Sequence, residues 1–260
     1  MHLFIKYKII NAVILVFIFY YISQKEKRLN EKEKSNLYIY DLKINHIKEP
    51  FGIDIKGNSF SFLSREEGPF KSYILLNNKV VQSRKVKLQE TNSFYFNKPL
   101  QYNKIYKFVV EGSSTKNELE VETALKLKST FIKPKNKELF SPIFIRNFNA
   151  NKEINSARLF ITGLGLYQAF INNNKVGNAY LTPGFNDYDY YLRYQTYNIT
   201  NLLKKENIIE VHMGNGWYKG RFGMNKEEEY NIFGEEYKLC LHILIQYKDK
   251  TILNILTDEL

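Results

Sequence analysis

The feature that most constrains the fold is an alternation of apolar and polar residues with a period of two, which begins near residue 37. It recurs in short runs at residues 38–44, 59–63, 72–76 and 105–110. Small clusters of Gly, Asn and Ser separate these runs, as is typical of strands joined by tight turns. Neither a long amphipathic helix nor a strand–helix–strand unit follows residue 37, so the sequence predicts an all-β fold without a nucleotide-binding sheet.

The alternating runs form two groups, which predict two successive β-sandwich domains. Residues 37–125 have the length and strand spacing of an immunoglobulin-like or fibronectin type III sandwich. The Lys-rich residues 126–139 are expected to be a linker, and residues 140–260 a second β-rich domain. Asn172 begins an expected tight turn, and Thr200 is the expected N-cap of a short helical turn over residues 199–205. Strands of the second domain are expected at residues 143–148, 156–161, 166–171, 208–213 and 237–247, with a last one near 252–256.

An apolar run at residues 9–22 follows two lysines, as in a signal sequence. Bulky residues end this run where a cleavage site would need small ones, so residues 1–36 are predicted to be an uncleaved signal anchor followed by a charged linker. A removed signal peptide and secretion are the alternative, and a buried helix is a second one. The five basic residues between positions 25 and 34 would by themselves keep the following chain in the cytoplasm.

Charge and cysteine content exclude several classes of site. The chain of 260 residues has a net charge of +11, but its basic residues are dispersed and no nucleic-acid-binding motif occurs. Abundant Lys, Asn, Ile, Tyr and Phe are also what AT-rich codons would produce, so we expect no nucleic-acid partner. A single cysteine, Cys240, excludes an intrachain disulfide, and its apolar neighbours predict a buried structural thiol.

Two motif-rich segments, residues 181–191 and 214–223, contain the side chains that a sugar site requires. Sugar rings need a flat apolar surface on one side and carboxylate, amide or guanidinium groups for their hydroxyls. Trp217, in a segment with four glycines, is the expected stacking residue, and the alternative is that it fills the sandwich core. The full set of candidate sugar-binding residues is Asp187, Tyr188, Asn215, Trp217, Tyr218 and Arg221.

The acidic residues of the first segment permit two further interpretations. Asp187 and Asp189 would lie on one face of a strand, about 7 Å apart, as glycosidase carboxylates can. Asn186 and Asp187 could instead supply oxygen ligands to calcium, although the spacing is not that of an EF-hand. The sequence leaves both open.

Several collinear motifs occur over residues 142–259, including Thr162-Gly163-Leu164-Gly165, Leu181-Thr182-Pro183-Gly184-Phe185-Asn186-Asp187-Tyr188 and Gly214-Asn215-Gly216-Trp217-Tyr218-Lys219-Gly220. Together they resemble the N-terminal module of bacterial α-L-rhamnosidases. Residues 45–62 resemble, less strongly, the fibronectin-like domain that opens these enzymes. The resemblance implies a fibronectin-like sandwich followed by a jelly-roll module, and related modules bind rhamnose through calcium.

The resemblance also implies where catalysis would occur. In the family, hydrolysis belongs to a downstream (α/α)₆ barrel, which does not occur in these residues, so no residue here is assigned a catalytic role. We therefore expect the carbohydrate-recognition part of a truncated or split α-L-rhamnosidase, with an incomplete jelly roll and a separately encoded catalytic domain as one partner. A membrane-anchored adhesion protein and an active rhamnosidase are the alternatives. Rhamnosides are met outside the cytoplasm, so the resemblance favours a chain facing the exterior or periplasm.

Overall fold

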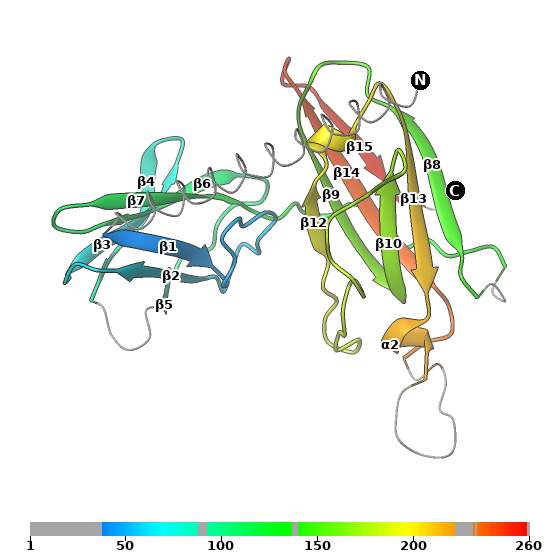
Figure 1. The fold of residues 1–260 in the computed structure, drawn as a ribbon, viewed down its shortest axis with the longest axis horizontal. Coiled ribbons are helices and arrows are strands. Elements are labelled where there is room, and N and C mark those ends of the chain that lie inside the picture. Colours follow the sequence, from blue (N-terminus) through cyan, green and yellow to red (C-terminus); the bar gives the residue numbers. More distant parts are fainter. Residues whose placement is uncertain (1–37, 88–92, 137–139, 222–230, 232, 259–260) are drawn as a thin grey trace, which may run out of the picture. The chain divides into compact units, whose positions relative to one another are not determined.

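The computed structural model describes residues 38–87, 93–136, 140–221, 231 and 233–258. The predicted signal anchor at residues 9–22 lies outside these ranges and stays a prediction. The chain divides into two compact units, with the boundary between Ala124 and Leu125 (Figure 1).

Strands dominate both units, which confirms the all-β prediction. In the described residues the only helical elements are the four-residue helix α2 (Gly216–Lys219) and one 3₁₀ turn (Thr200–Leu202). Neither is long enough to cross a membrane.

The first unit is a sandwich of two antiparallel sheets. Its smaller sheet has the order β1-β2-β5, comprising β1 (Ile39–Ile44), β2 (Ser59–Ser64) and β5 (Ser93–Tyr95). Its larger sheet has the order β4-β3-β6-β7, comprising β4 (Lys79–Val86), β3 (Phe70–Leu76), β6 (Ile105–Glu111) and β7 (Lys116–Glu122).

Phenylalanine rings fill the space between these two sheets. The ring of Phe60 lies 5.0 Å from that of Phe108, and the ring of Phe62 lies 5.1 Å from that of Phe70, both edge to face. Phe94 also packs among them and is buried. Phe60 and Phe62 are alternate residues of β2, which is why the period-two pattern predicted that strand, whereas β5, which carries Phe94, was not predicted.

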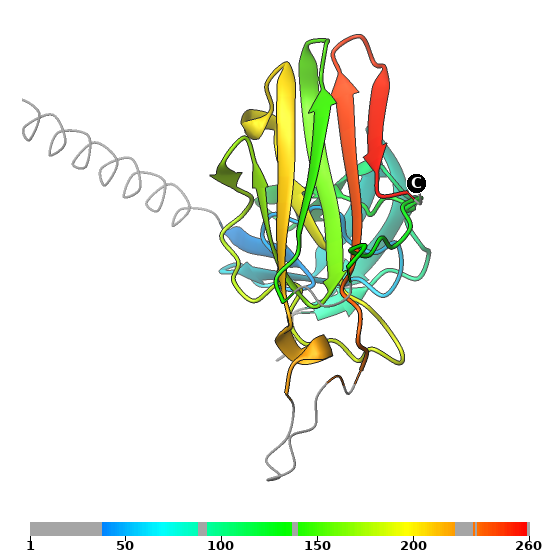
Figure 2. The same ribbon diagram turned by 90° about the vertical axis from the view of Figure 1, so that its right-hand side faces the viewer.

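The second unit is also a sandwich of two antiparallel sheets, each with four strands (Figure 2). One sheet has the order β11-β10-β13-β8, comprising β11 (Asn174–Lys175), β10 (Leu166–Ile171), β13 (Glu206–Gly214) and β8 (Ile143–Asn149). The other has the order β12-β9-β14-β15, comprising β12 (Gln195–Asn198), β9 (Ile154–Leu164), β14 (Lys238–Tyr247) and β15 (Ile252–Leu256).

Local sequence signals are partly confirmed in this unit. The Asn turn is present, because Asn172 and Asn173 both have positive φ, at 51° and 66°, and join β10 to β11. The prediction of Thr200 as a helix N-cap is wrong. Its hydroxyl accepts a hydrogen bond from the Ala157 N–H at 2.9 Å and donates one to Asn198, so it joins the turn to β9 and does not cap a helix.

Residues 126–139, predicted to be a linker, include a stretch that is hydrogen-bonded to the second unit. The Ser129 hydroxyl donates to the Leu241 carbonyl at 2.7 Å, and the Thr130 N–H donates to the Thr257 carbonyl at 2.9 Å. Ile132 and Leu239 exchange two backbone hydrogen bonds of 2.9 Å. This stretch therefore lies along β14 beyond the point where β15 ends.

Candidate functional site

The two motif-rich segments meet at one end of the second unit. The first lies in the loop between β11 and β12, residues 176–194, and the second contains α2, which directly follows β13 (Figures 1 and 2). Two bonds between Thr182 and Tyr167 hold the loop to β10. The Tyr167 N–H donates to the Thr182 carbonyl at 2.8 Å, and the Thr182 hydroxyl donates to the Tyr167 carbonyl at 2.7 Å.

Four aromatic rings, which we name the aromatic cluster, join the two segments: Phe185, Tyr188, Tyr218 and Phe233. The ring centre of Tyr188 lies 5.1 Å from that of Tyr218 and 4.8 Å from that of Phe233. Phe185 lies 6.1 Å from Tyr188. Burial raises the pKa of both the Tyr188 and Tyr218 hydroxyls, and the neighbouring charge of Glu236 raises that of Tyr218 further. Both phenols are therefore neutral hydrogen-bond donors at neutral pH.

The short helix α2 is held against the core by its first residues. Gly216 has φ +54°, and a Cβ there would lie 2.5 Å from the Leu166 side chain, so this position requires glycine. The Asn215 side-chain oxygen accepts a hydrogen bond from the Tyr237 hydroxyl. The Lys219 ammonium lies 4.4 Å from the centre of the Tyr237 ring. Gly216 thus brings the start of α2 close to β10.

The structure brings two of the predicted sugar-binding residues into contact, and the others differ in how exposed they are. Tyr188 and Tyr218 are in ring contact, although Tyr218 is buried. Trp217 is half-buried and is not a member of the hydrophobic core, so it does not fill the sandwich. Asn215 and Arg221 are exposed, and Arg221 is the last residue before an undescribed segment.

The acidic side chains of the loop face solvent. Asp187 and Asp189 are both exposed. The Asp187 carbonyl accepts from the N–H groups of Tyr190 and Tyr191 at 3.0 and 2.9 Å, so this part of the loop turns sharply. That turn replaces the strand geometry on which the two-carboxylate interpretation depended.

The Asn186 side chain holds the loop together from inside. It is fully buried, and its side-chain oxygen accepts from the Arg193 N–H at 2.9 Å, which closes the loop on itself. Within the described residues, no group of three or more His, Cys, Asp or Glu side chains is placed to hold a metal ion. Calcium at Asn186 and Asp187 stays a prediction. The prediction of a buried Cys240 is confirmed.

Sequence reasoning left several exposed aromatic side chains of this loop out of the candidate site. Tyr190 is 85% exposed, Tyr191 50% and Phe185 46%. Phe233 also escaped notice because it is distant in sequence and joins the cluster only in the folded chain. The sequence feature that could have indicated them is the run of tyrosines in a polar loop. A single exposed aromatic side chain is ordinary, whereas adjacent ones can form an apolar patch.

Comparisons with known proteins agree with this architecture. Residues 152–260 match the family model of the α-L-rhamnosidase N-terminal domain. An α-L-rhamnosidase of Streptomyces avermitilis is 36% identical over 102 residues, which cover 39% of this chain and 10% of that protein. One from Formosa agariphila is 34% identical over 125 residues, covering 46% of this chain and 13% of the relative. The chain thus spans only about a tenth of these relatives' length.

Two solved structures share the fold over most of the chain. The α-L-rhamnosidase of Dictyoglumus thermophilum aligns with a TM-score of 0.68 and 25% identity, covering 86% of this chain and 29% of that one. The enzyme of Aspergillus terreus aligns with a TM-score of 0.69 and 24% identity, covering 85% and 28%. Residues 152–260 are therefore similar to the α-L-rhamnosidase N-terminal domain, and the chain as a whole resembles the N-terminal part of α-L-rhamnosidases.

Proposed function

We propose that the loop end of the second unit binds a rhamnose-containing carbohydrate, as the recognition part of an α-L-rhamnosidase-like glycoside hydrolase. The observation that carries this proposal is the loop of residues 176–194, in which exposed aromatic rings accompany two exposed carboxylates. The relatives' name supports rhamnose as the sugar.

The geometry of the loop suits a sugar ring better than it suits a charged or extended ligand. Tyr190, Tyr191 and Phe185 offer apolar faces to solvent. Rhamnose is a deoxysugar with a methyl group and an apolar face, so stacking on aromatic rings removes apolar surface from water. The carboxylates of Asp187 and Asp189, close to these rings in the chain, can accept hydrogen bonds from its hydroxyls.

We also propose the finer domain assignment, in which residues 37–125 are a fibronectin type III-like sandwich and residues 140–260 a jelly-roll module. The arrangement of three and four strands in the first unit supports the former, and the two four-stranded sheets of the second unit support the latter.

Calorimetric titration of the full chain with L-rhamnose tests the binding proposal. We expect a dissociation constant near millimolar, about −4 kcal/mol, because a single sugar ring buries little surface. Replacing both Tyr190 and Tyr191 by Ala should abolish the heat. The matched control is Tyr95→Ala, because Tyr95 is similarly exposed but belongs to β5 of the first unit.

Two further measurements sharpen the result. Fluorescence of Trp217, the only tryptophan, should change on titration if the sugar reaches α2. Repeating the titration with a chelator decides whether calcium takes part. Absence of heat up to roughly 50 mM rhamnose, far above the expected constant, would reject the proposal. Release of free rhamnose from an aryl rhamnoside by this chain would show that it also carries a catalytic site.

A further inference from the structure

The side chain of Arg193 lies beside the exposed ring of Tyr191, near the end of the loop of residues 176–194. Its guanidinium nitrogen Nη2 lies 3.4 Å from the Tyr191 hydroxyl, and its guanidinium carbon lies 5.7 Å from the centre of the Tyr191 ring. Both side chains are exposed. Because the close contact is to the hydroxyl, the guanidinium lies at that end of the ring and not over its centre. Within the described residues the Arg193 guanidinium makes no ion pair.

Buried side chains hold both backbone groups of Arg193. Its N–H donates to the side-chain oxygen of Asn186 at 2.9 Å, and its carbonyl accepts from the Thr162 hydroxyl of β9 at 2.6 Å. Asn186 and Thr162 are both buried. The Tyr191 N–H is also bonded, to the Asp187 carbonyl at 2.9 Å. The ring and the guanidinium therefore extend from fixed backbone positions, which reduces the conformational entropy that is lost when a ligand binds.

Arg193 supplies the hydrogen-bond donors that the other polar groups of the loop lack. A sugar hydroxyl both donates and accepts, whereas the exposed carboxylates of Asp187 and Asp189, when ionised, only accept. A guanidinium has five N–H donors and no acceptor, and the contact with Tyr191 uses one of them. The other donors can bond the hydroxyl oxygens of a sugar that lies on the Tyr191 ring.

The shape of the guanidinium favours two adjacent hydroxyls over a single one. Its N–H groups lie in one plane and form a rigid fork, which bonds the two oxygens of a carboxylate at once. The same fork can bond the oxygens on two adjacent carbons of a sugar ring, and a lysine ammonium has no such fork. Rhamnose carries hydroxyls on C2, C3 and C4, so the C3 hydroxyl belongs to both adjacent pairs.

We propose that Arg193 recognises the sugar hydroxyls at this site, donating to two adjacent hydroxyls of a rhamnose unit whose apolar face lies on the Tyr191 ring. The inference rests on the proposed rhamnose binding and adds the hydroxyl pair that is recognised. Arg221, the guanidinium expected from the sequence, belongs to the other segment, whereas Arg193 lies in the loop that carries the exposed tyrosines and carboxylates. The site is therefore selective for rhamnose units that are unsubstituted at C3.

Titration of the full chain with methyl α-L-rhamnoside and its 2-, 3- and 4-deoxy analogues, followed by NMR, tests the proposal. Loss of the C3 hydroxyl, and of one of the other two, should weaken binding at least about tenfold, as expected when a charge-assisted hydrogen bond is lost. Arg193→Ala should bind the parent glycoside at least about tenfold more weakly, and removal of the C3 hydroxyl should then have little further effect. Arg193→Lys, which keeps the charge but not the fork, should retain only part of the affinity.

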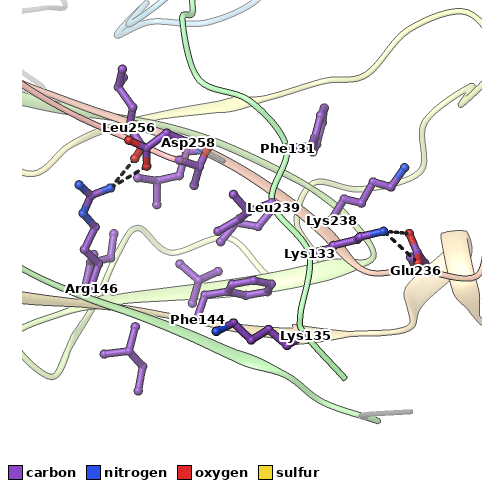
Figure 3. A pocket seen from close by; sticks show the side chains of 16 residues that line it. Phe131, Lys133, Lys135, Phe144, Arg146, Glu236, Lys238, Leu239, Leu256 and Asp258 are labelled. Carbon is purple, nitrogen blue, oxygen red and sulfur yellow. Dashed lines mark hydrogen bonds and ion pairs between the residues drawn. The ribbon is translucent and has the colours of Figure 1, made fainter. Parts of the chain in front are cut away.

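The matched control is Arg146→Ala, which removes an exposed arginine from the same unit. Arg146 lies beside a cleft of about 960 Å³ between β8 and the end of β15, where its guanidinium donates to the Leu256 carbonyl and lies 3.4 Å from the Asp258 carboxylate (Figure 3). The cleft shares no lining residue with the loop of residues 176–194. Arg146→Ala should therefore leave the affinity for all four glycosides unaltered.

The possible outcomes separate the role of Arg193 from rhamnose binding itself. Failure of the unmodified chain to bind methyl α-L-rhamnoside up to roughly 50 mM would reject both proposals. Binding that Arg193→Ala leaves unaltered would overturn only the role of Arg193. Weakening by the same factor for all four glycosides would also overturn it, because Arg193 would then act on the orientation of Tyr191 and not on a sugar hydroxyl.

Discussion

Removing the hydroxyl of Tyr237 tests whether one hydrogen-bonding group couples α2 to the core. Tyr237 is almost completely buried, and its hydroxyl lies 2.6 Å from the Phe140 carbonyl and also contacts the side-chain oxygen of Asn215. The single proton can be donated to only one of these acceptors at a time. Tyr237→Phe keeps the ring in the core, so the variant isolates the hydrogen bond from the packing.

The expected loss of stability in Tyr237→Phe follows from the surroundings of the two acceptor oxygens. Phe140 and Asn215 are both exposed residues, so water can reach their oxygens once the hydroxyl is gone. The loss of stability should therefore be the net value of one hydrogen bond, about 0.5–1.5 kcal/mol, and not the larger penalty of a buried unpaired acceptor. Burial raises the pKa of the Tyr237 hydroxyl, so the contribution is present at neutral pH and is lost only as the pH rises above about 10.

Urea unfolding of the variant and of Tyr247→Phe measures this effect. Tyr247 belongs to the same core, but its hydroxyl has no protein partner within the described residues, so its change should stay below about 0.5 kcal/mol. In Tyr237→Phe, hydrogen exchange should also quicken at the Lys219 and Gly220 N–H groups, which bond to Asn215 and Gly216. A loss above about 3 kcal/mol, or no loss relative to Tyr247→Phe, would refute the reasoning.

Three other predictions concern separate parts of the chain. Hydrogen bonds from Lys152 and Thr251 lower the pKa of Asp249 to about 2, so its stabilising contribution is complete above its ordinary pKa of about 3.9 and is lost as the pH falls towards 2. Asp249→Asn should remove that part of the acid sensitivity, measured as the change in urea midpoint between about pH 6 and pH 2.5. Gly165→Ala should destabilise by about 1–3 kcal/mol, because φ is +113° and a Cβ would lie 2.8 Å from the Gly214 carbonyl oxygen. Gly214→Ala is its control in thermal unfolding, since a Cβ there meets nothing within 4 Å. If residues 9–22 anchor the chain, it should remain in carbonate-washed membranes, and Val13→Lys with Phe17→Lys should release it, at a cost of about 2.5–3.5 kcal/mol each. Recovery of a shortened soluble form would contradict the anchor.

Strands with a clear apolar face or a continuous apolar run were predictable from the sequence, and strands without either were not. β14 was expected because residues 239–245 are an almost continuous apolar run, and all seven are buried. β4 and β7 were missed because β4 is almost wholly exposed and β7 is rich in charged residues. Pairing with β3 and β6 places these two strands in the sheet, and that pairing is a property of the backbone.

The sequence by itself determined the all-β class, the Asn172–Asn173 turn and the two segments that meet at one end of the second unit. Each depends on residues within a few positions of one another: period-two burial, the left-handed tolerance of Asn, and clustered Gly and aromatic residues. Only the tertiary structure decided that Phe233 joins Tyr188, that Tyr218 is buried while Tyr190 is exposed, and that residues 129–132 lie along β14. The cleft between β8 and β15 is likewise tertiary, because its walls come from strands over 100 residues apart in the chain. Local signals encode which backbone conformation a segment adopts, whereas such contacts depend on how the two sheets pack, and no short stretch of sequence contains that information.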